Sequence, residues 1–286
     1  MITVGQAFDQ FLRGLELTAA QGAEATRQQT VVRTKLGTHL GGVTSAFLSG
    51  SYGRSTAIRP LNDIDLFVIL DEATHGALRK SKPEACLELV QRALVEAYRG
   101  KTLPRIQGRS VNIEFTGTGI AFDVVPAFAV ASGGYIIPDR ELKNWIQTNP
   151  KQHEAAGIAA NERAGNKLNL LIKAAKHWNN RNDKPLRSFH LEVMSYSAFS
   201  QAPTTYAEGL AKLFTHLASA VMVACPVPSS AGPNIDAGMT TADRTGIQSK
   251  LRKAAEAADR ALVFERSQQI EKANAEWRGL MGAEYP

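Results

Sequence analysis

The fold is decided by the segment GSYGRST (residues 50–56) and, soon after it, the segment NDIDLFVIL (residues 62–70). Leu66–Leu70 is apolar at every position, which is typical of a strand buried on both faces at the centre of a sheet. The glycines and serines of the first segment are typical of a tight turn. The sequence therefore predicts a turn, followed by a central strand that begins with two carboxylates, Asp63 and Asp65.

These two carboxylates are two residues apart on the predicted strand. Residues at that spacing project from the same face, with Cα atoms about 6–7 Å apart. Two carboxylates placed so close repel each other, and a divalent cation between them removes the repulsion. Magnesium prefers oxygen ligands and keeps positions open for phosphate oxygens and water. Asp63 and Asp65 are therefore candidate metal ligands.

A third carboxylate, Asp123, stands inside the apolar run Ile120–Val125. The alternation in Val111–Phe115 and the turn-forming residues Thr116–Gly119 predict a hairpin whose second strand carries Asp123. A charge in an apolar run is costly unless it is paired or bound to metal. Two carboxylates on one strand and one on a neighbour can hold two metal ions about 3.5–4 Å apart, the separation that serves in-line phosphoryl transfer.

Gly50 and Ser51 are candidate phosphate-binding residues. A glycine lets backbone N–H groups approach phosphate closely, and a serine hydroxyl adds a further donor. Glu114 also lies on the predicted hairpin, but the register of the turn decides whether it lies near Asp123.

The rest of the chain alternates between recognisable helices and loops. We predict amphipathic helices within Val4–Leu36 and from Pro83 to about Tyr98, a loop over Pro226–Gly238, and a mostly helical chain after Pro150. The fold class is α+β and bilobal: residues 1–150 form a lobe with a mixed central sheet and a long N-terminal helix, and residues 151–286 form a helical lobe.

Composition narrows the class of protein. The 286 residues carry a net charge of +6, a surplus that favours polyanionic ligands such as triphosphates. Cys86 and Cys225 cannot form a disulfide framework or a cysteine-rich zinc site, and we expect both to be buried, inert thiols. The first residues lack the features of a secretory signal, and no stretch approaches the roughly 20 apolar residues of a membrane span. We expect a cytoplasmic protein without a membrane partner.

The carboxylate pattern, together with further motifs, carries a family resemblance. The pattern of Gly50-Ser51, Asp63-x-Asp65 and a distant Asp123 resembles the DNA polymerase beta-like nucleotidyltransferase superfamily. Within it, the chain resembles the bacterial cGAS/DncV-like nucleotidyltransferases (CD-NTases) over nearly its whole length. The other motifs that carry this likeness are residues 107–111 (QGRSV), 122–126 (FDVVP), 145–150 (WIQTNP), 171–178 (LIKAAKHW), 188–192 (SFHLE) and 277–286 (WRGLMGAEYP).

This resemblance implies an enzyme that joins nucleoside triphosphates, ATP with ATP or GTP, into a cyclic di- or trinucleotide and releases pyrophosphate. The product would be a second messenger of antiphage (CBASS) signalling, sensed by an effector protein encoded nearby. Two Mg²⁺ ions, or Mn²⁺ as a substitute, would be the cofactors. The resemblance also implies a monomer, and the lack of a Cys/His cluster argues against activation by nucleic acid.

The resemblance also assigns roles to residues. Asp63, Asp65 and Asp123 would be the catalytic and metal-binding carboxylates. The nucleotide-binding residues would be Gly50, Ser51, Ser55, Lys176 on the donor triphosphate, Ser188 on its distal phosphates, and Gln107 near the acceptor.

Three further expectations concern residues outside that set. Ser55 stands where relatives often carry a glycine. We expect Lys173 to lie on a solvated basic face, and His177 and His190 to be structural, because two-metal transfer needs no histidine base.

Two other functions use the same residues. A linear oligonucleotide synthetase, or a transferase that modifies RNA or a small molecule, would share the carboxylates and differ in its acceptor pocket. A non-catalytic nucleotide- or RNA-binding module would have little need for clustered carboxylates. The sequence does not determine the bases, the ring size or the 2′-5′ or 3′-5′ linkage of a product.

Overall fold

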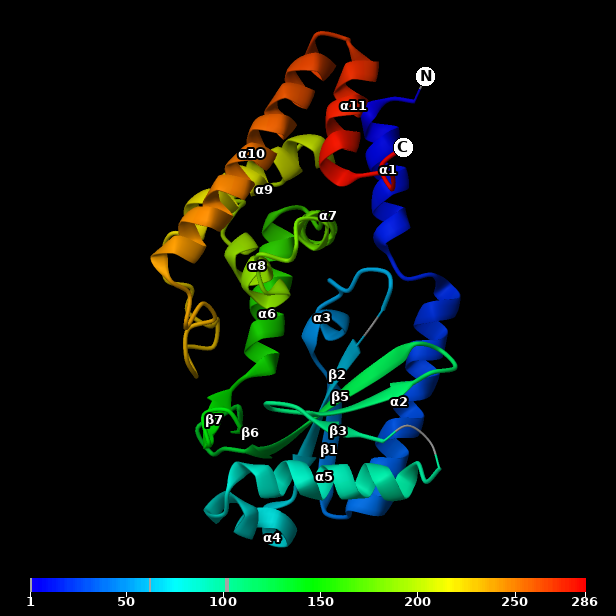
Figure 1. Cartoon of the computed structure of the whole chain (residues 1–286), viewed down its shortest axis with the longest axis vertical. Helices are drawn as coiled ribbons and strands as arrows, with labels where there is room; N and C mark the ends of the chain where they lie inside the picture. The colour runs from blue at the N-terminus through cyan, green and yellow to red at the C-terminus, as the bar shows by residue number, and fades with distance from the viewer. Residues whose placement is uncertain (1, 62, 101–102) are drawn as a thin grey trace. The chain divides into compact units, whose positions relative to one another are not determined.

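The computed structural model describes residues 2–61, 63–100 and 103–286, so Asn62 of the acidic segment lies outside the described residues. The chain forms two compact units, each assembled from separate stretches of sequence (Figure 1). We call them the sheet unit and the helical unit. The sheet unit comprises Leu17–Ser55 and Pro60–Glu154. The helical unit comprises Met1–Glu16, Thr56–Arg59 and Ala155–Pro286.

A mixed sheet forms the centre of the sheet unit. Five of its strands follow the order β1-β2-β5-β4-β3. Their bounds are β1 Val43–Leu48, β2 Asp63–Leu70, β3 Arg105–Ile106, β4 Val111–Phe115 and β5 Ile120–Ala129. The central strand β2 is antiparallel to β1 and parallel to β5, and β5 forms an antiparallel hairpin with β4. The predicted central strand and the predicted hairpin are both confirmed.

Two further strands, β6 (Tyr135–Asp139) and β7 (Asn144–Thr148), form an antiparallel hairpin, and β6 pairs with the end of β5. The sequence did not predict this hairpin. Pro138 and the polar residues around the turn interrupt the alternation that marks a strand, so only pairing with β5 and packing identify it.

The two faces of the sheet have different surroundings because side chains alternate along each strand. Ile64 and Leu66 are fully buried on one face. Two helices, α2 (Ala19–Leu40) and α5 (Pro83–Ala97), pack against each other and against the sheet. On the other face Phe67, Ile69, Val125, Ala127 and Ile137 form a small apolar cluster. Asp63 and Asp65 precede that cluster on the same face of β2.

Three short helical turns complete the sheet unit. They are α3 (Gly50–Gly53) directly after β1, and α4 (Glu72–His75) with the 3-10 helix η1 (Gly76–Lys80) after β2. Asp71 caps α4, since its carboxylate accepts a hydrogen bond from the backbone N–H of Thr74 at 3.0 Å.

The helical unit packs its helices around one core. Its helices are α1 (Val4–Leu15), α6 (Pro150–Arg163, which begins in the sheet unit), α7 (Leu168–Arg181), α8 (Ser188–Ser195), α9 (Tyr206–Ala220), α10 (Thr241–Arg266) and α11 (Ile270–Met281). The apolar faces predicted for α7 and α10 are buried, and 226–238 forms the predicted loop. No helix in the described part of the chain is long and apolar enough to cross a bilayer.

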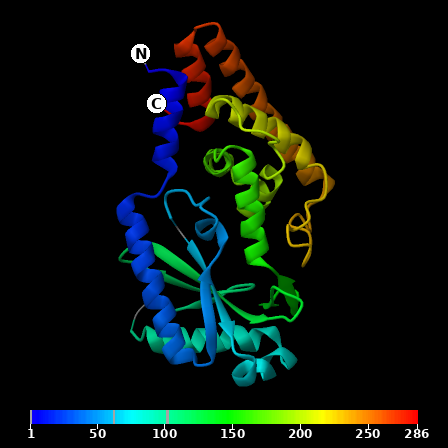
Figure 2. The same ribbon diagram turned by 180° about the vertical axis from the view of Figure 1, so that it is seen from behind.

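We expected the division between the lobes at residue 150, with the N-terminal helix in the first lobe. The structure places α1 in the other unit. This helix belongs to the helical unit and lies beside α11 in both views (Figure 1, Figure 2). The reason is aromatic packing. The centroid of the Phe8 ring lies 4.8 Å from that of the Trp277 ring and 5.3 Å from that of the Tyr285 ring. Periodicity identified the apolar stripe of α1 but not its distant partners.

The segment Thr56–Arg59 is fixed to the helical unit by a buried polar network. The Lys176 ammonium donates to Glu192 at 2.9 Å and to the Thr56 hydroxyl at 3.0 Å, and the Thr56 hydroxyl donates to Glu192 at 2.9 Å. The side chains of Lys176 and Glu192 are 5% and 0% exposed. Such a pair depends on both partners, because either charge alone would be buried without compensation.

We expect Glu192→Leu to lower the free energy of unfolding by about 3–5 kcal/mol, because it leaves the Lys176 charge buried alone. The double substitution Lys176→Met with Glu192→Leu should recover most of that loss. Urea titration followed by circular dichroism measures both. The control is Glu276→Leu, which breaks the exposed pair with Arg260 and should cost at most about 1 kcal/mol. Equal losses for Glu192→Leu and Glu276→Leu would contradict the role of the buried pair.

Candidate active site

The parallel register of β2 and β5 brings the three predicted carboxylates to one face of the sheet. Asp65 lies directly opposite Asp123, and Asp63 lies opposite Ala121. Residues two apart on a strand share a face, so Asp63, Asp65 and Asp123 project from the same side. All three stand near the amino-terminal ends of their strands.

Asp65 is held against the turn that the sequence predicted after β1. The backbone N–H of Ser49 donates to the Asp65 carbonyl at 2.9 Å, and α3 begins at the next residue. Gly50 has φ +62°, and a Cβ added there would lie 1.6 Å from the Asp65 carboxylate oxygen Oδ2. Glycine is therefore required at position 50 twice over, by its left-handed backbone and by the close approach of Asp65.

Asn112 on the neighbouring strand β4 orients the side chain of Asp123. Asn112 pairs with Asp123 in the β4–β5 register, is 7% exposed, and donates its side-chain amide to Asp123 Oδ1 at 2.9 Å. Glu114 lies opposite Ala121 and so shares this face. Its carboxylate is 3.7 Å from the guanidinium of Arg105, the residue opposite Asn112 on β3.

Sequence reasoning missed Asn112 and Arg105 and left Glu114 open. The signal was present in the hairpin: Phe115 pairs with Ile120 across the four-residue loop. Counting back from that pair places Asn112 opposite Asp123. The turn residues Thr116–Gly119 were predicted, but the pair that closes the turn was not, so the residue opposite Asp123 was not identified.

Ionisation of two of these carboxylates is unfavourable at their positions. The pKa of Asp65 is raised to about 6, first by burial and then by the charges of Asp63 and Asp123, whereas Arg54 opposes the shift. Burial also raises the pKa of Asp123, against the lowering effect of its hydrogen bond from Asn112. Both shifts indicate that the ionised carboxylates lack a sufficient counter-charge.

A divalent metal fits the chemistry of this donor set. Within the described residues, no three His, Cys, Asp or Glu side chains already converge on one metal position. Instead Asp63 is exposed, Asp65 turns toward Gly50 and Asp123 turns toward Asn112. The shared face, the oxygen donors and the raised pKa values are what a hard cation would neutralise.

The other predicted nucleotide-binding residues of the sheet unit lie at turns. Ser51 is part of α3, and Ser55 is exposed with φ +59°. That left-handed backbone is a position where glycine is easily accommodated. Gln107 lies in the turn between β3 and β4, where its side chain accepts a hydrogen bond from the Ser110 hydroxyl at 2.9 Å. This turn lies beyond the pair of Asn112 and Asp123, toward the carboxyl end of β5.

The remaining two, Lys176 and Ser188, lie in the helical unit. Lys176 is buried in the network with Thr56 and Glu192 described above, and Ser188 is the exposed first residue of α8. The expectation for Lys173 is wrong: it is 8% exposed and pairs with Glu16 at 2.9 Å. Helices α1, α8, α9 and α11 all contact α7, which therefore has little solvated surface.

The two histidines have different surroundings. His177 Nε2 lies 2.8 Å from the Met281 carbonyl oxygen, which is consistent with the structural role expected for it. His190 is 1% exposed, and its Nε2 has no hydrogen-bond partner among the described residues.

Comparison with known proteins identifies the family. A family model described as "Second Messenger Oligonucleotide or Dinucleotide Synthetase domain" matches residues 1–161, more than half of the chain. The chain belongs to this family, the bacterial CD-NTases. It is therefore a nucleotidyltransferase of the cyclic nucleotide synthase class.

Other CD-NTases are similar over most of the chain. A cyclic AMP-AMP-AMP synthase from Acinetobacter sp. is 28% identical over 263 residues, covering 84% of this chain and 72% of that protein. A cyclic AMP-AMP-GMP synthase from Enterobacter hormaechei is 24% identical, covering 85% of this chain and 81% of that protein.

Solved structures share the fold. E. coli CdnC with ATP matches with a TM-score of 0.77 at 18% identity and covers 100% of this chain and 99% of that one. Vibrio cholerae DncV in its apo form matches with a TM-score of 0.76 at 14% identity and covers 99% and 96%. The expected α+β class with a mixed central sheet and a long N-terminal helix is thus confirmed.

We expect Asp65→Asn to raise the free energy of unfolding of the metal-free protein by about 2 kcal/mol at pH 7.5. A raised pKa in the folded state favours the protonated carboxyl, so its contribution to stability is full below the ordinary pKa of 3.8 and is lost as the pH rises through about 6. The gain from Asp65→Asn should therefore disappear near pH 4. Urea titrations with EDTA at both pH values measure it.

The matched control for this measurement is Asp71→Asn at the other end of β2. Hydrogen bonds from Thr74 lower the pKa of Asp71, so its substitution should give no gain at pH 7.5. A gain in the free energy of unfolding for Asp65→Asn that does not change with pH would contradict the raised pKa of Asp65.

We expect Gly50→Ala to reduce pyrophosphate release from ATP and GTP by about 100-fold, because its Cβ displaces the Asp65 carboxylate. Gly41→Ala is the matched control. Gly41 also has a left-handed backbone, with φ +65°, but an added Cβ there would meet no atom within 4 Å. Both substitutions should cost about 1–2 kcal/mol of stability, and only Gly50→Ala should lose activity. Equal activities of the two variants would show that Gly50 is not part of the active site.

Proposed function

We propose that this chain joins ATP with ATP, or ATP with GTP, into a cyclic di- or trinucleotide by two-metal nucleotidyl transfer. The observation that carries the proposal is the placement of Asp63, Asp65 and Asp123 on one sheet face, with Asp65 against the Gly50 turn. Adenosine as a substrate is supported by the two relatives named above, since the names of both products contain AMP at two or more positions.

The chemistry is one bond exchange that is repeated until the ring closes. A ribose hydroxyl oxygen bonds to the α-phosphorus of a second triphosphate, the bond from that phosphorus to the oxygen bridging to the β-phosphate breaks, and pyrophosphate leaves. The hydroxyl proton passes to a base. We assign this role to Asp123, the carboxylate opposite Asp65 in the strand register.

Asp63, Asp65 and Asp123 would hold two Mg²⁺ ions, or Mn²⁺ in their place, and these ions supply charge neutralisation for the phosphates and acidity for the hydroxyl. Asn112 fixes Oδ1 of Asp123 through its amide, which leaves the second oxygen of that carboxylate for the site. The hydrogen bond also holds the Asp123 side chain in one orientation while the reacting groups change.

We assign the triphosphate to the predicted nucleotide-binding residues. Gly50 and Ser51 would supply backbone and hydroxyl donors to phosphate, with Ser55 at the end of the same turn. Ser188 and Lys176 are assigned to the donor triphosphate and Gln107 to the acceptor nucleotide; Lys176 would exchange one of its bonds to Thr56 or Glu192 for a phosphate oxygen.

The biological setting is also part of the proposal. We propose that the product is an antiphage second messenger sensed by an effector protein encoded nearby, and that the enzyme acts in the cytoplasm as a monomer without nucleic acid activation. The E. coli CdnC structure in complex with a HORMA protein shows that a family member can assemble with another protein.

The test is product analysis with the full chain, Mg²⁺ and α-labelled triphosphates, singly and in pairs, followed by mass spectrometry. We expect a labelled product that resists phosphatase, because a cyclic product has no terminal phosphate. A product that loses its terminal phosphates identifies a linear synthetase. Nucleotide binding without any incorporation identifies a non-catalytic module.

Asp63→Asn combined with Asp65→Asn should reduce incorporation by at least about 1,000-fold, since it removes two metal ligands, and should leave the circular dichroism spectrum unchanged. Asp71→Asn is the control, because it changes the aspartate that directly follows β2 and caps α4, and asparagine caps a helix about equally well. Normal product formation by the doubly substituted protein would show that the metal assignment is wrong.

A further inference from the structure

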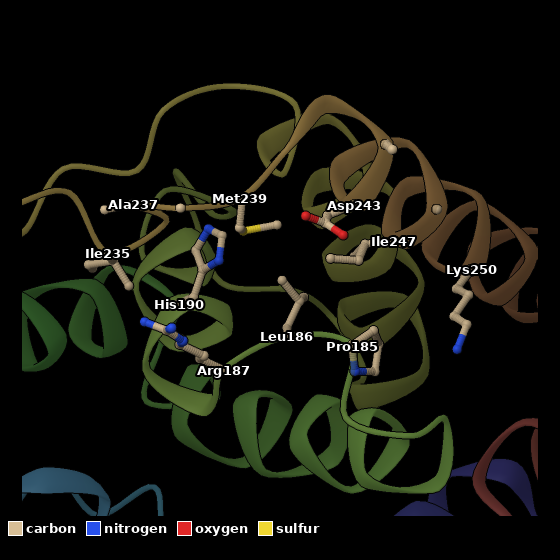
Figure 3. Close-up of a pocket in the computed structure, with 13 residues that line it drawn as sticks. Pro185, Leu186, Arg187, His190, Ile235, Ala237, Met239, Asp243, Ile247 and Lys250 are labelled. Carbon is tan, nitrogen blue, oxygen red and sulfur yellow. The ribbon is translucent and has the colours of Figure 1, made fainter. Parts of the chain in front are cut away.

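The helical unit contains a cavity that no step of the proposed reaction uses. It has a volume of about 520 Å³ and lies between the start of α8, the start of α10 and the loop that precedes α10 (Figure 3). Cavities of about 300–1,000 Å³ are of the size that binds small molecules. Every residue that lines this one belongs to the helical unit.

The cavity has an apolar wall. Leu186, Ile235, Met239 and Ile247 line it (Figure 3). Leu186 is 3% and Ile247 7% exposed, so the wall is part of the packed core. Gly246 on α10 adds open space, since a Cβ there would meet no atom within 4 Å. Such a wall favours an apolar ring system.

His190 supplies an unsatisfied polar group at the edge of this wall. His190 and Met239 both line the cavity (Figure 3), and the enclosed Nε2 of His190 has no hydrogen-bond partner among the described residues. Buried polar side-chain atoms nearly always have a partner. Met239 is unbranched and flexible, so it can move aside to let a ligand atom reach the ring.

The charged groups of the cavity leave one cation for a ligand. Asp243 is used in capping α10, where it accepts hydrogen bonds from the backbone N–H and hydroxyl of Thr240 at 2.9 and 2.7 Å. Lys250 donates to the Asn182 carbonyl at 3.0 Å. The exposed Arg187 guanidinium makes no hydrogen bond or ion pair within the described chain. One free cation matches one anionic group, which is too little for a triphosphate.

This cavity faces away from the side of α8 that we assign to the nucleotide. Residues two apart on a helix are separated by about 200°, and residues four apart by about 40°. Ser188 and Glu192 therefore share one side of α8, and Glu192 on that side binds Lys176. His190 points to the opposite side.

We propose that this cavity is a second ligand site, separate from the nucleotide site, for a small molecule with an apolar ring system and one carboxylate- or sulfonate-like group. The ring system packs between Leu186, Met239 and Ile247. The anionic group pairs with Arg187, and a polar atom of the ligand bonds to His190.

The test uses 8-anilinonaphthalene-1-sulfonate as the anionic probe and N-phenyl-1-naphthylamine as its neutral analogue, each titrated into the full chain and followed by fluorescence. We expect one saturable site for the anionic probe that saturating ATP with Mg²⁺ does not displace. Arg187→Gln should weaken the anionic probe about tenfold and leave the affinity of the neutral one unchanged. Displacement by ATP, or equal effects on both probes, overturns the proposal.

Gly246→Leu should abolish probe binding, because its side chain fills the cavity. Gly279→Leu is the matched control: Gly279 is also a helical glycine with no atom within 4 Å of an added Cβ, but it does not line this cavity. Thermal unfolding confirms that both variants fold. Unchanged binding in Gly246→Leu overturns the assignment.

His190→Leu separates a ligand role from a structural one. We expect it to weaken the anionic probe severalfold and to raise the thermal midpoint of the ligand-free protein, because it removes an enclosed atom without a partner. A lowered midpoint would show that His190 has a structural partner, and the proposal would then fail.

Discussion

The parallel register of β2 and β5 sets Asp65 directly opposite Asp123, and aspartate side chains in that arrangement repel each other. The sheet holds the backbone positions fixed, so the repulsion cannot be relieved by moving the strands. It is relieved only by protonation, by turning the side chains apart, or by a cation. The raised pKa of Asp65 reflects its burial first and this repulsion second, while Gly50 makes room for the Asp65 carboxylate and Asn112 holds that of Asp123.

Much of this arrangement could be predicted from the sequence, where a local pattern carried it. Leu66–Leu70 has the continuous apolar character of a central strand, and Asp123 stands out in an apolar run. Contacts between distant segments could not be predicted. Neither the partner of Asn112 nor the burial of Lys173 follows from local periodicity, because both depend on which elements meet in the folded chain.

In the helical unit, too, the partners of buried polar side chains could not be predicted from the sequence. Lys176 was expected to differ from Lys173, yet both are buried and paired with carboxylates, Glu192 and Glu16. The pair of Lys176 and Glu192 also binds Thr56, which follows Ser55 directly.

Packing of α1 against α11 has a consequence for how the chain acquires its structure. Phe8 packs on Trp277 and Tyr285, so during synthesis α1 waits for these partners until every residue between Phe8 and Trp277 has been made. Contacts between segments so distant in sequence slow folding. Until then α7 and α9 can cover part of the apolar side of α1, but the Phe8 ring lacks its aromatic neighbours, and such exposed apolar surface favours aggregation.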